Sequence, residues 1–213
     1  MRFFLLLLLP LAVFAEDVFH PEPTGTFTYA GVRFGLLIQG PGILASSAAM
    51  KPEDGWPKQE GAAWETRGSI TLSSGAVVRV VERVVKLADG AADVELRLES
   101  ATPMKVDTAA MVVELPVADF VGRGLVYNGG EAVPLPREAS EGMLSAHWKS
   151  GIATITIPSG EHSLTLHGTL DCAVADERVW DLPRFGLRLF CQRADAPALT
   201  KATLRFSVGP AAP

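Results

Sequence analysis

The stretch DVELRLE, residues 93–99, alternates apolar and charged side chains one by one. Val94, Leu96 and Leu98 would face one way and the charged residues the other, which is typical of a β-strand with one buried face. An amphipathic helix would instead repeat its apolar residues every three to four positions. This stretch therefore predicts a sheet that is covered on one side by a core.

The same alternation recurs at residues 153–157, 162–174 and 203–208. Residues 76–87 are ambiguous, because their charged side chains fall at helical spacing. The six valines of this segment favour a strand, since β-branched side chains lose rotamer freedom in a helix. Turn residues lie on both sides of it, so we expect a strand that pairs with residues 94–99.

Many short strands separated by Gly, Pro and Asn predict an all-β fold with little helix, a single antiparallel β-sandwich of the large two-sheet or jelly-roll-like kind. Residues 44–51 could form about one helical turn. Residues 40–60 and 129–142 are expected to be long loops, which in a compact domain are functional or mobile. We expect one domain over residues 16–209 and a disordered tail at 210–213.

The first fifteen residues have the pattern of a cleavable signal peptide. Arg2 gives a positive start, Phe3 to Phe14 is almost purely apolar, and Ala15 provides a small residue for cleavage. The alternative is an uncleaved anchor, but the run is well short of the ~20 residues that a membrane span needs. The sequence therefore predicts export to a periplasmic or extracellular location, with no membrane span after cleavage.

Composition and motifs exclude several functions. The chain has 19 Lys and Arg against 24 Asp and Glu, and it has no basic cluster that would bind nucleic acid. It lacks a G-x-S-x-G turn, an H-E-x-x-H pair and a Gly-rich phosphate loop. The four histidines do not have the spacing of a metal site, so neither a cofactor nor a metal is predicted. A metal site assembled from distant strands remains the alternative.

The two cysteines of an exported chain invite pairing. Cys172 and Cys191 lie on the apolar faces of two successive predicted strands. A hairpin that placed them opposite each other would allow a disulfide, contributing about 3 kcal/mol in the chain-entropy model. The alternative is a pair of buried free thiols.

Two tryptophans in loops are the best candidates for ligand contact. Indole rings stack on the apolar faces of sugar rings, while nearby carboxylates and arginines hold the hydroxyl groups. Trp180 has Asp181, Arg184 and Arg188 close in sequence, and Trp56 lies between Gly55 and Pro57. The alternative is that both indoles close the ends of the sandwich as part of the core.

A second polar set could support catalysis. His147 and Lys149 share a face opposite Trp148, and with residues of a neighbouring strand they could form a polar patch on a sheet. Tyr127, His147 and Arg188 could then shuttle the proton that a polysaccharide lyase moves. An ordinary solvated face is the alternative, and no pair of carboxylates for a glycosidase can be assigned.

Three stretches carry a family resemblance: ADVELRLES at 92–100, MVVELPVADFVGRGLVYNGGEAVPLP at 111–136 and DERVWDLPRFGLRLF at 176–190. Together they resemble the all-β sandwich modules that accompany secreted glycoside hydrolases and polysaccharide lyases. Such modules flank a separate catalytic domain. The resemblance therefore implies a sandwich fold and a binding role, and it transfers no catalytic residues.

We therefore expect an exported, non-catalytic, carbohydrate-directed accessory or binding protein, with polysaccharide or envelope components as partners. A polysaccharide lyase or glycoside hydrolase of β-sandwich fold is the first alternative. A structural or assembly protein of the cell envelope is the second, and it would show a broad apolar patch or an unpaired edge strand.

Overall fold

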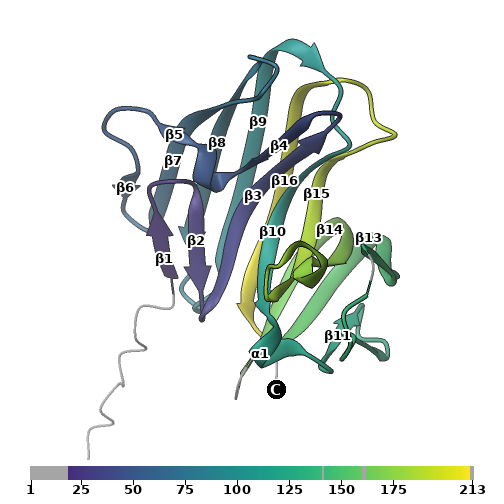
Figure 1. Ribbon diagram of the computed structural model, residues 1–213. Coiled ribbons are helices and arrows are strands. Elements are labelled where there is room, and N and C mark those ends of the chain that lie inside the picture. The colour runs from purple at the N-terminus through teal and green to yellow at the C-terminus, as the bar shows by residue number, and fades with distance from the viewer. Residues whose placement is uncertain (1–18, 141, 160–161, 212–213) are drawn as a thin grey trace, which may run out of the picture.

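The computed structural model describes residues 19–140, 142–159 and 162–211 (Figure 1). The expected signal peptide at residues 1–15 and the last two residues of the expected tail lie outside this range. Within it, nearly all regular structure is antiparallel β-strand, as predicted. The helical elements are the 3-10 helices η1 (Ser47–Ala49) and η2 (Glu177–Trp180) and the α-helix α1 (Val117–Phe120).

The strands occupy the chain from Phe19 to Pro210. They are β1 (Phe19–Glu22), β2 (Thr26–Tyr29), β3 (Val32–Gly40), β4 (Ile43–Ser46), β5 (Lys51–Pro52), β6 (Lys58–Glu60), β7 (Ala63–Thr71), β8 (Val77–Lys86), β9 (Ala92–Met104), β10 (Thr108–Pro116), β11 (Gly124–Tyr127), β12 (Ala132–Pro134), β13 (Met143–Ser159), β14 (His162–Asp176), β15 (Arg184–Arg193) and β16 (Leu199–Pro210).

All strands belong to one hydrogen-bonded network. Its main path runs β1-β2-β3-β10-β15-β14-β16-β9-β8-β7-β5. β2 and β4 pair with successive parts of β3, at residues 32–34 and 37–40. On the other side of the network β13 pairs with β14, and β11 pairs with β13. β14 also changes partner along its length, pairing with β16 at residues 164–168 and with β15 at residues 172–176.

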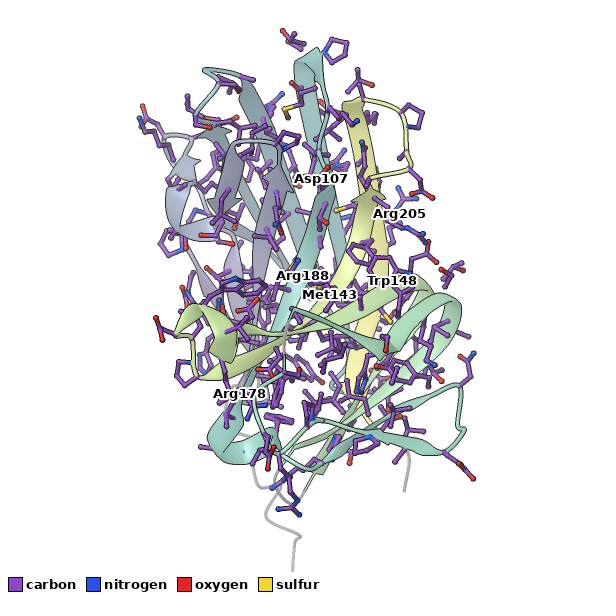
Figure 2. All side chains as sticks on the ribbon, turned by 45° about the vertical axis from the view of Figure 1, so that its right-hand side comes forward. Asp107, Met143, Trp148, Arg178, Arg188 and Arg205 are labelled. Atoms are coloured by element: carbon purple, nitrogen blue, oxygen red, sulfur yellow. The ribbon has the colours of Figure 1, made fainter. Side chains whose placement is uncertain are left out.

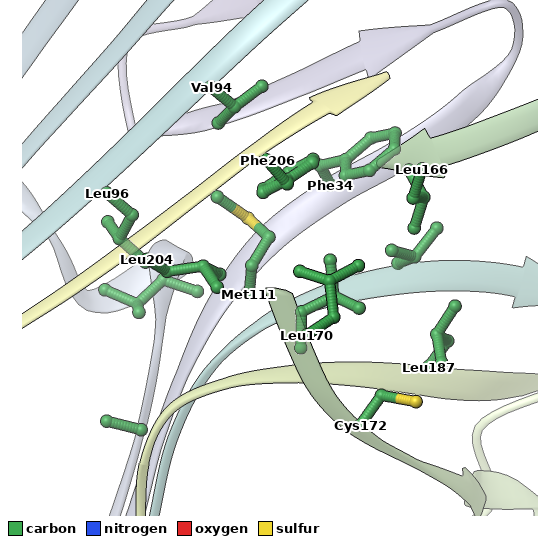
Figure 3. Close-up of a cluster of buried hydrophobic side chains, with 14 of the residues drawn as sticks. Phe34, Val94, Leu96, Met111, Leu166, Leu170, Cys172, Leu187, Leu204 and Phe206 are labelled. Atoms are coloured by element: carbon green, nitrogen blue, oxygen red, sulfur yellow. The ribbon is translucent and has the colours of Figure 1, made fainter. Parts of the chain in front are cut away.

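The sheet curls on itself (Figure 1) and encloses an apolar core, part of which is shown in Figure 3. The ring of Phe34 on β3 lies 4.6 Å from that of Phe27 and 6.1 Å from that of Phe206 on β16, a strand that does not adjoin β3. Near the two ends of the strand path, Phe19 of β1 contacts Trp64 of β7 at 5.2 Å between ring centroids. These contacts bring β1–β3 in front of β7–β9 and β16 (Figure 1).

The predicted strands are confirmed, and the predicted loops are partly wrong. Residues 77–86 form β8 and pair with β9 as expected, with Val84 opposite Val94. The segment 40–60 contains β4, η1, β5 and β6, and the segment 129–142 contains β12. Short strands at the edge of a sheet have too few residues for an alternation to be visible in the sequence. β16 ends at Pro210, the first residue of the expected tail.

The predicted disulfide is wrong, because Cys172 and Cys191 are unpaired. In the β14–β15 hairpin Cys172 lies opposite Leu189, two residues before Cys191. β10 pairs Ala109 with Gln192 and Ala110 with Phe190, which leaves Cys191 as the extra residue of a β-bulge. Because Cys172 is opposite Leu189, the two thiols do not occupy opposed positions, and the bulge interrupts the alternation of side chains at Cys191.

Candidate functional site

A groove lies between η2 and the β3–β4 corner, on the outer side of β15. It has a volume of about 650 Å³, which is within the range of small-molecule sites. We call it the Trp180 groove. It is lined by Leu37, Gln39, Leu44, Ala45, Ser46, Ala48, Ala49, Glu177, Trp180, Leu182, Arg184 and Arg188.

The walls of the Trp180 groove are mostly aliphatic, and its mouth carries exposed apolar side chains. Leu44 is 79% exposed, Trp180 51% and Leu182 41%. Large apolar side chains that remain this exposed next to one another are unusual on a surface that binds nothing. The polar members come from the strands and from η2 and are Gln39, Ser46, Glu177, Arg184 and Arg188.

A chain of charged side chains crosses the outer face of β3, β10 and β15. Arg184 Nη1 lies 2.6 Å from Glu114 Oε1, and Arg184 Nε donates to Glu177 Oε2 at 2.7 Å. Burial acts to lower the pKa of Arg184, but Glu177 and Glu114 outweigh it and raise the pKa. Glu177 can lie flat on the sheet because residue 186 is glycine, where a Cβ atom would stand 2.6 Å from Glu177 Oε1.

Arg188 is less well paired than Arg184. Its Nη1 donates to Gln39 Oε1 at 3.3 Å, and its Nη2 lies 3.9 Å from Glu177 Oε1. Arg188 Nε is buried and has no hydrogen-bond partner among the described residues. Burial lowers the pKa of Arg188, and Glu177 only partly opposes this shift. The guanidinium lies 6.0 Å from the Trp180 ring.

The position of Trp180 depends on how η2 is held. Asp176 is the N-cap of η2 and accepts hydrogen bonds from Arg178 N, Nε and Nη2. Arg178 also donates to the carbonyl oxygens of residues 136, 137 and 138, and Ser140 donates to Asp176 Oδ2. Burial acts to raise the pKa of Asp176, but the hydrogen bonds from Arg178 and Ser140 lower it to about 2. Asp176 and Arg178 therefore clamp the segment 136–140 onto η2.

The structure brings together three of the five predicted ligand-binding residues. Trp180, Arg184 and Arg188 line the Trp180 groove. Asp181 ends η2 in a left-handed conformation, with φ of 59°, and its side chain is exposed outside the groove lining. Trp56 is half-buried elsewhere, with its ring centroid 4.4 Å from the Arg67 guanidinium and 4.5 Å from Lys58 Nζ.

The proposed proton-shuttling set does not assemble. Tyr127 Oη and His147 Nδ1 are 2.7 Å apart, but both residues are buried, and His147 Nε2 contacts the Pro134 carbonyl oxygen. Burial raises the pKa of Tyr127 and lowers that of His147. Arg188 instead lines the Trp180 groove. The predicted polar patch is also wrong, because His147 points into the protein and Trp148 points out.

A second pair of aromatic and cationic side chains lies on another part of the surface. Trp148 of β13 is 46% exposed, contacts Phe190, and lies 5.6 Å from the guanidinium of Arg193. Figure 2 shows Trp148 and Arg188 apart, with Met143 between them. This pair resembles Trp180 and Arg188 in composition, but Arg193 is paired with Asp171 and Asp195.

Nine of the twelve residues that line the groove were not among the predicted site residues, and three of these matter most to its chemistry: Gln39, Leu44 and Glu177. Gln39 and Arg188 are 149 residues apart in the chain and meet only because β10 joins β3 to β15. Leu44 is a single apolar residue in a segment predicted to be a loop. Glu177 is close in sequence to Trp180, Arg184 and Arg188, and this closeness was the only sign in the sequence that it belongs to the same site.

We also searched the described residues for a metal site and for a membrane-spanning helix. No group of three or more His, Cys, Asp and Glu side chains among the described residues could hold a metal ion. None of the helices that the structure describes has the length and apolar character needed to cross a bilayer. Comparisons with protein-family models, with curated proteins and with solved structures found no match.

Proposed function

We propose that this chain is an exported, non-catalytic binding protein for carbohydrate, and that the Trp180 groove is its ligand site. The observation that supports this most directly is the convergence of Trp180, Arg184 and Arg188 on one groove. A half-exposed indole gives a face for the C–H surface of a sugar ring, and the polar groups beneath it can hold hydroxyl groups. Export rests on the sequence of residues 1–15.

The proposal takes the curled sheet as a β-sandwich. The contacts between Phe34 and Phe206 support two layers that face each other. β3, β4, β10 and β15 would form the layer that carries the groove. A barrel-like closure of the same strands would present the groove unchanged, so the binding proposal does not depend on this choice.

Binding of the purified protein to an array of neutral and acidic polysaccharides tests the proposal. We expect binding that the Trp180→Ala variant weakens by about tenfold, because loss of an aromatic stacking contact costs on the order of 1 kcal/mol or more. Trp148→Ala is the matched control, since it removes a similarly exposed indole outside the groove. Absence of binding to every polysaccharide, or equal loss in both variants, would rule the proposal out.

Assembly with an envelope protein is a second candidate, and the apolar mouth of the groove favours it. Leu44 and Leu182 are exposed side chains of the kind that a protein partner covers. In that case Leu44→Ser would abolish association with the partner while sugar binding is absent. If Leu44→Ser reduces polysaccharide binding together with Trp180→Ala, the mouth belongs to the sugar site instead.

A further inference from the structure

Arg188 is the one cation of the Trp180 groove whose charge is incompletely matched. It is buried, with 6% of its surface exposed, and its Nε has no partner among the described residues. Its closest acceptor is the neutral amide oxygen of Gln39. Burying a guanidinium without a close anion is costly, so a site that retains one is a candidate for binding an anion.

The nearby acids do not supply the missing partner. Glu177 Oε2 accepts from Arg184 Nε at 2.7 Å, while its other oxygen stands 3.9 Å from Arg188 Nη2, beyond hydrogen-bond distance. Glu114 pairs with Arg184 and Arg33. Arg184 is thus held between the carboxylates of Glu114 and Glu177. Of these two carboxylates, Arg188 has only the second oxygen of Glu177 nearby, at 3.9 Å.

The surroundings of Arg188 select among anions. A planar guanidinium matches a carboxylate through two parallel N–H···O bonds. A phosphate or sulfate dianion would need more donors, but Arg184 is already committed to Glu114 and Glu177. Glu177 would also repel a doubly charged group more strongly than a singly charged one. The aliphatic walls formed by Leu37, Leu44 and Leu182 add no donors.

We propose that Arg188 binds the carboxylate of an acidic sugar, a uronic acid, whose ring stacks against Trp180. This inference rests on the proposed carbohydrate-binding function. The guanidinium and the indole ring lie 6.0 Å apart and line the same groove. A uronic acid carries its carboxylate directly on the sugar ring, so one residue can meet both groups at once.

Calorimetric titration of the full chain with trimers of galacturonic acid and mannuronic acid, and with their methyl esters, tests this inference. The esters keep the ring and lose the charge. We expect at least one acid to bind about tenfold or more tightly than its ester, which corresponds to about 1.4 kcal/mol. Arg188→Met should remove that preference, leaving acid and ester equal.

Two variants keep the result interpretable. Arg188→Met should fold, because replacing a poorly paired buried charge with an apolar side chain is often neutral or stabilising. Arg188→Lys keeps the charge but loses the planar fork, and we expect it to lose most of the preference for the acid. Arg193→Met is the matched control, since Arg193 lies on the same strand and beside Trp148, and it should leave the preference intact.

The outcomes separate this inference from the proposed function. If acid and ester bind equally and only Trp180→Ala weakens them, uronate recognition is wrong and carbohydrate binding stands. If no sugar binds but decanoate does, in a manner that Arg188→Met abolishes, both the uronate inference and the carbohydrate proposal are wrong, and Arg188 holds the carboxylate of an aliphatic ligand. If neither the acidic trimers nor decanoate binds, both proposals are overturned and Arg188 binds neither kind of carboxylate.

Discussion

Glu82 is a carboxylic acid on the buried, core-facing side of β8. The inward positions of β8 are Val78, Val80, Glu82 and Val84, and Glu82 is only 4% exposed. Its neighbours across the sheet are Thr66 and Leu96. Glu82 Oε2 has no hydrogen-bond partner among the described residues, and burial raises the pKa of Glu82 to about 8.

This burial predicts a stability that falls as pH rises. Glu82 stays protonated in the folded protein and ionises in the unfolded chain near its ordinary pKa of 4.5. The free energy of unfolding should therefore fall by up to about 1.4 kcal/mol per pH unit between these values, and level off above about 8. Glu82→Gln should remove most of this slope in urea titrations at pH 5, 6.5 and 8. An unchanged slope would show that Glu82 is ionised in the folded state.

The two cysteines give a direct chemical prediction. Burial, with a smaller effect of Asp171 on Cys172, raises the pKa of both Cys172 and Cys191 to about 12. Native protein purified without reductant should react slowly with a thiol reagent at pH 8, because the thiolate is the reactive form. Unfolded protein should release two thiols per chain. A count of zero after unfolding without reductant would mean that the disulfide forms.

Among the elements, η2 is the one on which the Trp180 groove depends, because it carries Glu177 and Trp180. Asp176→Asn keeps the N-cap but removes the charge that holds Arg178 against the segment 136–140. We expect a loss of about 2–4 kcal/mol in the free energy of unfolding, since one partner of a largely buried ion pair is left uncompensated. Sugar binding should weaken as well, because Trp180 is the last residue of η2.

The ion pair of Asp176 and Arg178 also predicts how the free energy of unfolding changes at acid pH. The pKa of Asp176 is lowered from 3.8 to about 2 in the folded protein. Its contribution to stability is therefore present above about pH 4 and is lost as pH falls toward 2. Asp176→Asn should unfold with a smaller change in stability over this interval than the unmodified protein. Equal acid sensitivity of the two proteins would argue against the clamp.

The elements also show what the sequence could predict. Strands such as β8, β9, β14 and β16 are half-buried, so the alternation of their side chains reports the core directly. The pairing of β8 with β9 was predictable because the two strands adjoin in the chain. The Cys172 register was not, because the η2 connection between the two strands sets the β14–β15 alignment, and a short 3-10 helix gives no periodic signal in the sequence.

The candidate site was partly predictable for the same reason. Trp180, Arg184 and Arg188 are close in the chain, so their proximity in space needed only one turn and one strand. Gln39 and Leu44 belong to β3 and β4, on the other side of β10 from β15. Their position in the groove depends on the order of strands that are far apart in the chain. Trp56 was predicted to contact the ligand but lies outside the groove. The sequence gives no sign that Arg67 and Lys58 lie against its ring.

At the scale of the molecule, the continuous strand network predicts cooperative unfolding. Phe34 is fully buried and touches both Phe27 and Phe206, so it links strands that are far apart along the sheet. Phe34→Ala should lower the free energy of unfolding by about 3–5 kcal/mol, the usual cost of emptying a buried phenylalanine site. Val77→Ala, at an exposed position on β8, is the control and should change it by less than about 0.5 kcal/mol.

The way in which Phe34→Ala unfolds tests the network itself. Tryptophan fluorescence follows all four tryptophans, among them Trp64 of β7 and Trp180 of η2, while far-ultraviolet circular dichroism follows all strands. Because the core joins both regions, the two signals should shift to lower urea together and by the same amount. If fluorescence and circular dichroism instead give separate midpoints, the regions around the tryptophans and the remaining strands unfold independently. The contact between Phe34 and Phe206 would then not couple them.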